Sequence, residues 1–307
     1  MPIDLLQVIN SRAAVSLVSF LGQVIPPGIG YPLCDLVANW VATRRDSKVI
    51  QAVRVNQWMV HGANLEKEAL DKVVWETFRN NARNLYDLYH YVQSPETEQR
   101  TISLNPVARS LVERPEFGDR GLVIVGLHLS NFDLVLQSIC RQGFKAMILT
   151  LPDPQGGRRA EYERRRRTGM NLIPASLSAL RQAVNHLERG GMVLTGMDRP
   201  VSDPKYCPRF FGRGASLPIH SIYLASKAHV PVVIMAAIQR ADRKYHVMTS
   251  EPIEMEGYPE NGPDYGTQIL RNSEKVLSRV EDFIRLAPQQ WNMFLPVWPD
   301  MLEKVPI

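Results

Sequence analysis

The pair of residues best suited to chemistry is His128 and Asp133, five positions apart in the segment His-Leu-Ser-Asn-Phe-Asp. Histidine has an unperturbed pKa of about 6.5, so its ring can accept a proton near neutral pH. A carboxylate at the other ring nitrogen would fix the tautomer and stabilise the imidazolium that forms. We therefore predict that His128 is a general base and that Asp133 orients it.

The sequence around this pair contains no recognisable nucleophile. The patterns G-x-S-x-G, G-x-x-x-x-G-K, G-x-G-x-x-G and H-E-x-x-H are all absent from the chain. A histidine base without a protein nucleophile is expected to activate a substrate hydroxyl directly. The alternative is purely structural, with Asn131 or Asp133 capping a helix and His128 filling a polar corner.

Two further clusters could bind a substrate. One is Asp198-Arg199, and the other is the stretch 158–167, whose six arginines and two glutamates account for four of the five net positive charges. A charge concentrated in this way indicates a local anionic contact, such as a phosphate, an acidic carrier or lipid headgroups, rather than nucleic acid. Arg164 and Arg167 lie three apart on one predicted helix face, and either the patch binds a ligand or it is a solvated surface.

The elements that must position these residues indicate an α/β fold. Short apolar runs at 122–125, 145–149, 192–194 and 230–238 predict strands, and the segments 134–141, 178–189, 218–229 and 265–286 predict helices; 245–256 predicts edge strands. Strands that alternate with helices imply a central, mainly parallel sheet flanked by helices. His128, Asp198 and the basic stretch each follow a strand, so we expect all three at the carboxyl edge of the sheet, where such folds bind ligands.

The first 117 residues are predicted to be helical, with the clearest periodicity over 67–92. Apolar residues at three- and four-residue spacings between Leu6 and Val24 predict a helix that either packs in the core or lies in a membrane interface. No apolar run reaches the length of about 18 residues that a spanning helix needs. We expect one domain over 1–307, with a helical N-terminal region (1–117) and an α/β core (118–307).

The three cysteines indicate neither a disulfide framework nor a zinc site, because they include no C-x-x-C pair. We expect no metal ion and a reducing compartment.

His128-Leu-Ser-Asn-Phe-Asp133 resembles the H-x(4)-D signature of the lysophospholipid acyltransferase superfamily, in particular the lipid A lauroyl and myristoyl acyltransferases and the phosphatidylinositol mannoside acyltransferases. Further blocks are similar in order and separation over about residues 80–300. They are Gly191 to Arg199, Phe210 to Pro218, His229 to Met235 and Pro288 to Trp291.

The resemblance implies a glycerolipid acyltransferase-like fold and transfer of a fatty acyl chain from coenzyme A or acyl carrier protein to a hydroxyl of a membrane glycolipid or lysophospholipid. His128 and Asp133 would be catalytic, with no acyl-enzyme and no bound cofactor. Predicted substrate contacts are Ser130, Asn131, Arg164, Arg167, Asp198 and Arg199. The backbone N–H groups near 130–133 are candidate donors to the thioester oxygen. The implied location is the cytoplasmic face of a bacterial inner membrane.

Two other functions use the same residues. A thioesterase would direct the His-Asp pair at water, whereas a non-catalytic lipid-binding protein would use its apolar N-terminus and arginines to dock on a bilayer. A transferase is expected to release thiol mainly when a lipid acceptor is present, and a hydrolase needs none.

Overall fold

A seven-stranded sheet is the framework of the part of the chain that the computed structural model describes, which is 19–92, 94, 96, 100–113, 120–151, 157–202, 204–257 and 264–306. The strand order is β1-β9-β8-β2-β5-β3-β4. The strands are β1 (Ile102–Leu104), β2 (Leu122–Gly126), β3 (Met147–Thr150), β4 (Asn171–Pro174), β5 (Met192–Gly196), β8 (Val232–Gln239) and β9 (Tyr245–Thr249). Two short strands, β6 (Arg209–Phe210) and β7 (Arg213–Gly214), form a separate antiparallel hairpin.

The sheet is mainly parallel, as the alternation of strands and helices predicts. β2 pairs in parallel with β5 and β8, and β3 pairs in parallel with β4 and β5, whereas β8 and β9 are antiparallel. The first four residues of β2 are fully buried, because helices cover both faces of the sheet. A strand buried on both sides is apolar throughout, which is why 122–125 is a continuous β-branched and leucine run.

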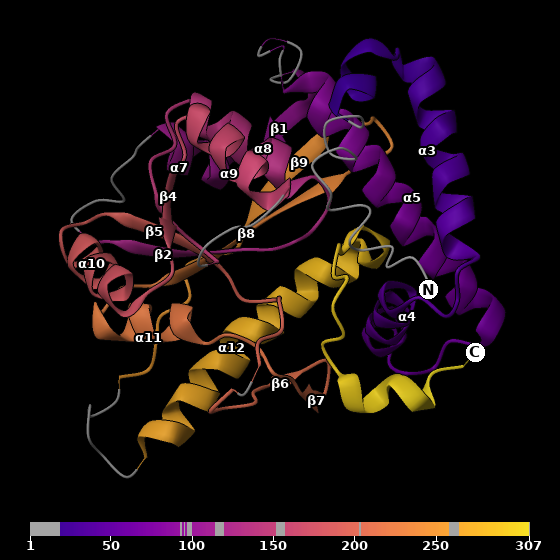
Figure 1. Ribbon diagram of the computed structural model, residues 1–307. Coiled ribbons are helices and arrows are strands. Elements are labelled where there is room, and N and C mark those ends of the chain that lie inside the picture. The colour runs from indigo at the N-terminus through magenta and orange to yellow at the C-terminus, as the bar shows by residue number, and fades with distance from the viewer. Residues whose placement is uncertain are drawn as a thin grey trace.

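Helices form a layer on each face of this sheet (Figure 1). One layer contains α7 (Pro106–Glu113), α8 (Phe132–Arg141) and α9 (Gly157–Arg167). The other contains α10 (Leu177–Glu188), α11 (His220–Lys227) and α12 (Tyr265–Leu286). The apolar residues of the two faces make two separate core clusters, since successive side chains of a strand point to opposite sides.

Three helices of the N-terminal region pack beside the sheet (Figure 1). They are α3 (Pro27–Ala42), α4 (Lys48–Val60) and α5 (Lys67–Tyr91), and two 3-10 helices, Pro288–Gln290 and Pro299–Lys304, pack against α5 and α4. The predicted helical region is confirmed for these elements, but the expectation of helix throughout 1–117 is wrong at β1. β1 precedes the range 118–307 that was predicted to form the α/β core, yet its backbone pairs with β9 and completes the edge of the sheet.

Most of the predicted helix from Leu6 to Val24 lies outside the described residues. The stretch that follows it forms α3. Among the described helices, none combines the length and the apolar character needed to cross a bilayer.

Candidate functional site

The carboxyl ends of β2 and β5 bring His128 and Asp198 together. The backbone N–H of His128 donates to Asp198 Oδ2 over 2.9 Å, and His128 Nδ1 lies 2.7 Å from Asp198 Oδ1. Asp198 is fully buried, whereas the side chain of His128 is 28% exposed. The carboxylate is therefore fixed behind the ring, and the ring forms part of the wall of a cavity.

The pairing determines what the imidazole can do. Burial by itself would raise the pKa of Asp198, but its contacts with His128 and a hydrogen bond from Trp291 outweigh burial and hold the pKa below its usual range. An ionised carboxylate accepts a hydrogen bond from Nδ1 when Nδ1 carries the proton, which leaves Nε2 as the basic nitrogen. The pair can therefore take a proton from a group in the cavity and stabilise the resulting imidazolium.

Trp291 is the third member of this cluster. Its indole Nε1 donates to Asp198 Oδ2 over 2.9 Å, and Leu129 forms an isolated antiparallel bridge with Trp291. The N–H of Asn292 donates to the carbonyl of His128 over 2.8 Å. The chain segment after α12 thus holds both the carboxylate and the loop that carries the histidine.

Ser130 and Asn131 support this loop. Ser130 adopts a positive φ of 51°, donates its N–H to the carbonyl of Gln290 over 2.8 Å, and accepts from Asn292 Nδ2 over 2.7 Å. Asn131 caps α8 by accepting from the N–H of Leu134 over 3.3 Å. These polar contacts hold the turn, and neither residue is among the described residues of the cavity wall, so a substrate contact of Ser130 or Asn131 stays a prediction.

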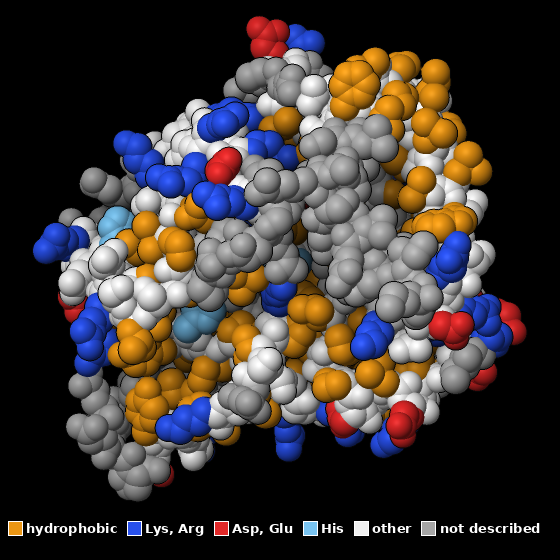
Figure 2. Space-filling model, in the orientation of Figure 1, with side chains coloured by type: hydrophobic (Ala, Val, Ile, Leu, Met, Phe, Trp, Pro, Cys, Tyr) orange, Lys and Arg blue, Asp and Glu red, His pale blue; other side chains and the backbone are white. Residues whose placement is uncertain are grey.

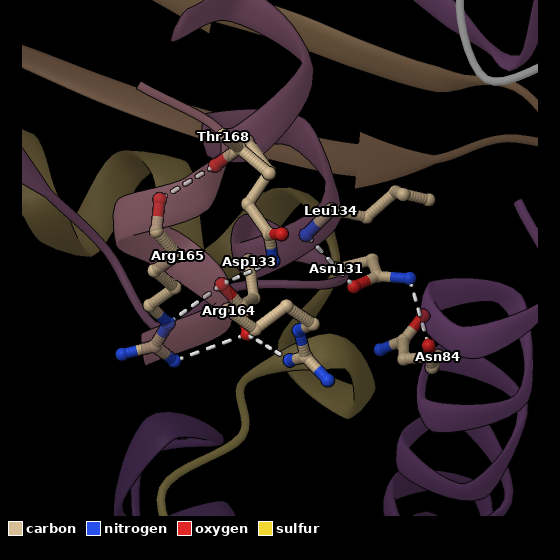
Figure 3. Close-up of polar contacts among 8 residues, drawn as sticks. Asn84, Asn131, Asp133, Leu134, Arg164, Arg165 and Thr168 are labelled. Atoms are coloured by element: carbon tan, nitrogen blue, oxygen red, sulfur yellow. Dashed lines mark hydrogen bonds and ion pairs between the residues drawn. The ribbon is translucent and has the colours of Figure 1, made fainter. Parts of the chain in front are cut away.

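Asn131 also joins α8 to α5. Its Nδ2 donates to the carbonyl of Asn84 over 2.8 Å (Figure 3). The sequence left either Asn131 or Asp133 as the residue that caps this helix, and the cap is Asn131.

Asp133 has other partners than His128. Its carboxylate accepts from Arg165 Nε over 2.8 Å and from Arg165 Nη2 over 3.0 Å, and Arg164 lies 3.4 Å away (Figure 3). The prediction that Asp133 orients His128 is therefore wrong: Asp198 holds that place. The physical reason is direction, because Asp133 stands in the first turn of α8 and points toward α9.

The arginines of α9 divide into two groups. Arg164 and Arg165 are half-buried beside Asp133, whereas Arg166 and Arg167 are exposed. Arg164 also lies over the ring of Tyr89 on α5, with its guanidinium carbon 5.0 Å from the ring centroid. Arg164 and Arg167 therefore do not share one surface, and contact with a substrate stays a prediction for both.

A cavity of about 560 Å³ opens beside His128. Its volume lies within the range of roughly 300–1,000 Å³ that is usual for ligand sites. The wall between α8, α9 and the sheet is apolar and is formed by Tyr162, Val135, Leu136, Ile139, Ile148, Leu172, Leu194, Met235, Ala237 and Val247. A long apolar chain could occupy this part of the cavity.

Two glycines form the wall next to the histidine. Gly126 and Gly196 face each other in the register of β2 and β5 and both line the cavity. A Cβ on Gly196 would meet His128 Cε1 at 3.5 Å. The missing side chains let a ligand approach the strand ends beside the ring.

The opposite wall of the cavity is more polar and contains Thr195, Arg199 and His220. His220, at the start of α11, is hydrogen-bonded through Nε2 to Thr195 Oγ1. Burial lowers the pKa of His220, which keeps its ring neutral at neutral pH. Arg199 is half-buried in this wall, as expected for a residue that follows β5.

Sequence patterns did not reveal Trp291, Thr195 and His220 as site residues. The only signal for Trp291 was the resemblance of the block Pro288 to Trp291. Within the described residues, no cluster of three histidine, cysteine, aspartate or glutamate side chains could hold a metal ion.

Comparison with known proteins identifies the family of this chain. A family model described as bacterial lipid A biosynthesis acyltransferase matches residues 9–299, which is nearly the whole chain. No curated protein sequence gives a significant match. The matched range includes His128, Asp198 and Trp291.

Proposed function

We propose a specific reaction for this chain, which belongs to the bacterial lipid A biosynthesis acyltransferase family and is therefore an acyltransferase. In this proposal the enzyme moves a fatty acyl chain from a thioester of coenzyme A or acyl carrier protein to a hydroxyl of a membrane glycolipid or lysophospholipid. The observation that carries it is the His128–Asp198 pair at the wall of an apolar cavity.

His128 acts as the general base. Nε2 takes the proton of the acceptor hydroxyl while the hydroxyl oxygen attacks the thioester carbonyl carbon and forms the C–O bond. The C–S bond then breaks, and the leaving sulfur takes the proton from the imidazolium and departs as a thiol. Asp198, rather than Asp133, stabilises the imidazolium, and this type of proton transfer contributes about 10²- to 10⁴-fold to a rate.

The acyl chain lies in the apolar part of the cavity. Side chains of α8 and of five sheet strands surround that space, so each methylene of the chain would leave water. Burial of a methylene is worth about 0.8 kcal/mol, which supports a long-chain donor over a short one. The polar wall with Thr195 and His220 is left for the head of the donor or for the acceptor.

The surface of α3 supports contact with a membrane. Large apolar side chains stay exposed along it and just before it; they are Phe20, Leu21, Val24, Ile29, Leu33, Leu36, Val37 and Trp40. Figure 2 shows these hydrophobic side chains together at the edge of the molecule. Arg44 stacks over Trp40, which places a cation beside the apolar surface. We propose peripheral binding of this surface to the cytoplasmic face of the cell membrane.

Variants of His128 and of the two aspartates, Asp198 and Asp133, test the mechanism. Acyl transfer from a long-chain acyl thioester is measured by mass spectrometry of lipid acceptors, together with thiol release. We expect His128→Ala to lower kcat by about 10²- to 10⁴-fold. Asp198→Asn, which cannot stabilise the imidazolium, should lower kcat at least about tenfold, with a much smaller effect of Asp133→Asn on kcat.

The same assay separates the alternatives. Thiol release that does not depend on an acceptor would indicate a thioesterase. Transfer that survives His128→Ala with less than a tenfold loss would overturn the base assignment. Absence of both transfer and thiol release in the wild-type protein would favour a lipid-binding role.

A further inference from the structure

We propose that Asp133 is a positioning residue that holds α9 over the apolar part of the cavity and so determines which acyl chain lengths the enzyme accepts. The inference rests on the proposed function. It gives Asp133 a role in recognition of the donor chain, separate from the proton transfer by His128 and Asp198.

The contact itself joins two helices. Asp133 belongs to the first turn of α8, and its bidentate partner Arg165 belongs to the last turn of α9. Gln137, one turn further along α8, donates to Asp133 Oδ1 over 3.0 Å. A bidentate guanidinium–carboxylate pair fixes both the distance and the angle between the two helices.

The pair is buried and charged. Burial alone would raise the pKa of Asp133, but the charge and hydrogen bonds of Arg165 outweigh it and hold the pKa below its usual value. Arg165 is half-buried, and Asp133 raises its pKa. Both groups therefore stay ionised, and removal of one partner would leave an uncompensated buried charge.

α9 forms part of the cavity wall. Glu161, Tyr162 and Arg165 line the cavity from α9, opposite the apolar side chains of the sheet. The hydroxyl of Tyr162 donates to the carbonyl of Leu172 on β4 over 3.1 Å, which ties the middle of the helix to the sheet. The position of α9 therefore sets the width of the apolar space.

Asp133 stands at the entrance to this space. It lines the cavity together with Phe132, and Val135, Leu136 and Ile139 continue along the same helix away from His128. A chain whose thioester lies at His128 would extend along α8 and beneath α9. Loss of the Asp133–Arg165 contact should loosen the wall around the more distant methylenes and leave the reacting carbonyl in place.

The experiment measures binding of alkyl thioethers of coenzyme A, which cannot react, over a series of increasing chain lengths. In the wild-type protein each methylene that enters the cavity should raise affinity by roughly fourfold. In Asp133→Asn the gain for each added methylene should fall to about twofold or less. In the transfer assay the KM for long-chain donors should rise, whereas kcat and its pH profile should stay close to wild type.

Matched variants show whether the contact is responsible. Arg165→Met combined with Asp133→Asn removes both charges, so it avoids an unpaired buried ion and should show the same reduced gain for each methylene. Arg166→Met changes the exposed neighbour on α9 and should retain the wild-type series. If Asp133→Asn does not fold, as judged by circular dichroism, the double variant makes the same comparison.

The proposal is wrong if the gain for each methylene is unchanged in Asp133→Asn or, where that variant does not fold, in the double variant. It is also wrong if the kcat of Asp133→Asn falls equally for donors of every chain length and the pH profile of kcat shifts. Asp133 would then act through His128. A failure of the proposed function looks different: the wild-type protein would bind thioethers with no dependence on chain length or would transfer no acyl group.

Discussion

At the scale of single residues, the cavity has two histidines with different surroundings. His128 has a carboxylate at Nδ1, whereas His220 has the hydroxyl of Thr195 at Nε2. A hydroxyl gives an imidazolium no counter-charge, and burial lowers the pKa of His220. His220 is therefore suited to a neutral hydrogen bond with a substrate and not to the uptake of a proton at neutral pH.

We expect His220→Ala to lower kcat/KM by roughly 2- to 12-fold, because a neutral hydrogen bond contributes about 0.5–1.5 kcal/mol. His220→Gln should lose less, since its amide can still hydrogen-bond. The acidic limb of the profile of kcat/KM against pH should persist in both variants. Loss of that limb in His220→Gln would show that His220, and not His128, is the base.

The sequence allowed a correct prediction of His128 at a strand end but not of its carboxylate partner. Asp133 is near in sequence, and a spacing of five residues cannot show which way a side chain points at a helix start. Asp198 reaches His128 from 70 positions away, which depends on the register of β2 with β5. Trp291 reaches Asp198 from a further 93 positions away, which depends on the path of the chain after α12.

At the scale of elements, Asp87 connects α5 with three other segments. Its carboxylate accepts from Tyr31 of α3 over 2.8 Å, from Gln239 of β8 over 3.4 Å, and from the hydroxyl of Tyr245 on β9. Burial raises the pKa of Asp87 and outweighs these hydrogen bonds, which lower it. Asp87 therefore differs from Asp133, whose pKa is lowered.

The two carboxylates should affect stability in opposite directions with pH. For Asp87 the folded-state pKa is higher than the unfolded value of about 3.9, so its contribution is present below that pH and is lost as pH rises through the folded-state pKa. The unfolding free energy of Asp87→Asn should therefore increase relative to wild type as pH rises above about 4. For Asp133 the contribution is present above about pH 4 and is lost at lower pH.

Denaturant titrations of Asp87→Asn, Asp133→Asn and the wild-type protein over a pH series measure this difference. Parallel pH curves for wild type and Asp87→Asn above about pH 4 would contradict the raised pKa. Element positions such as α8, α10 and α12 could be predicted from periodicity, but β1 and β4 could not, because Ile-Ser-Leu and Asn-Leu-Ile-Pro each hold only two residues typical of a strand core, whereas β3 holds three in a row.

At the scale of the whole molecule, the apolar surface of α3 should control binding to bilayers. Leu36 and Trp40 are 63% and 51% exposed and lie four residues apart on the helix. Burial of a large apolar side chain contributes about 1.5–3 kcal/mol, so Leu36→Glu or Trp40→Glu should each weaken binding at least about tenfold.

Co-sedimentation with vesicles that contain anionic phospholipids measures this binding. Leu286→Glu, at the end of α12, is a control because Leu286 is 64% exposed but lies outside α3. An equal loss for Leu286→Glu and Leu36→Glu would mean that α3 is not the binding surface. The amphipathic pattern between Leu6 and Val24 left core packing and a membrane interface equally open, and most of that segment lies outside the described residues. The binding surface proposed here is therefore argued from α3.

The bridge between Leu129 and Trp291 has a consequence for synthesis of the protein. A nascent chain that ends just after Asp198 already contains His128 and Asp198, but Trp291, whose indole holds the carboxylate, is added only 93 residues later. The pair can reach its final geometry only when the segment that carries Trp291 has also emerged. Until then an incomplete enzyme would have little capacity to act on the thioesters around it.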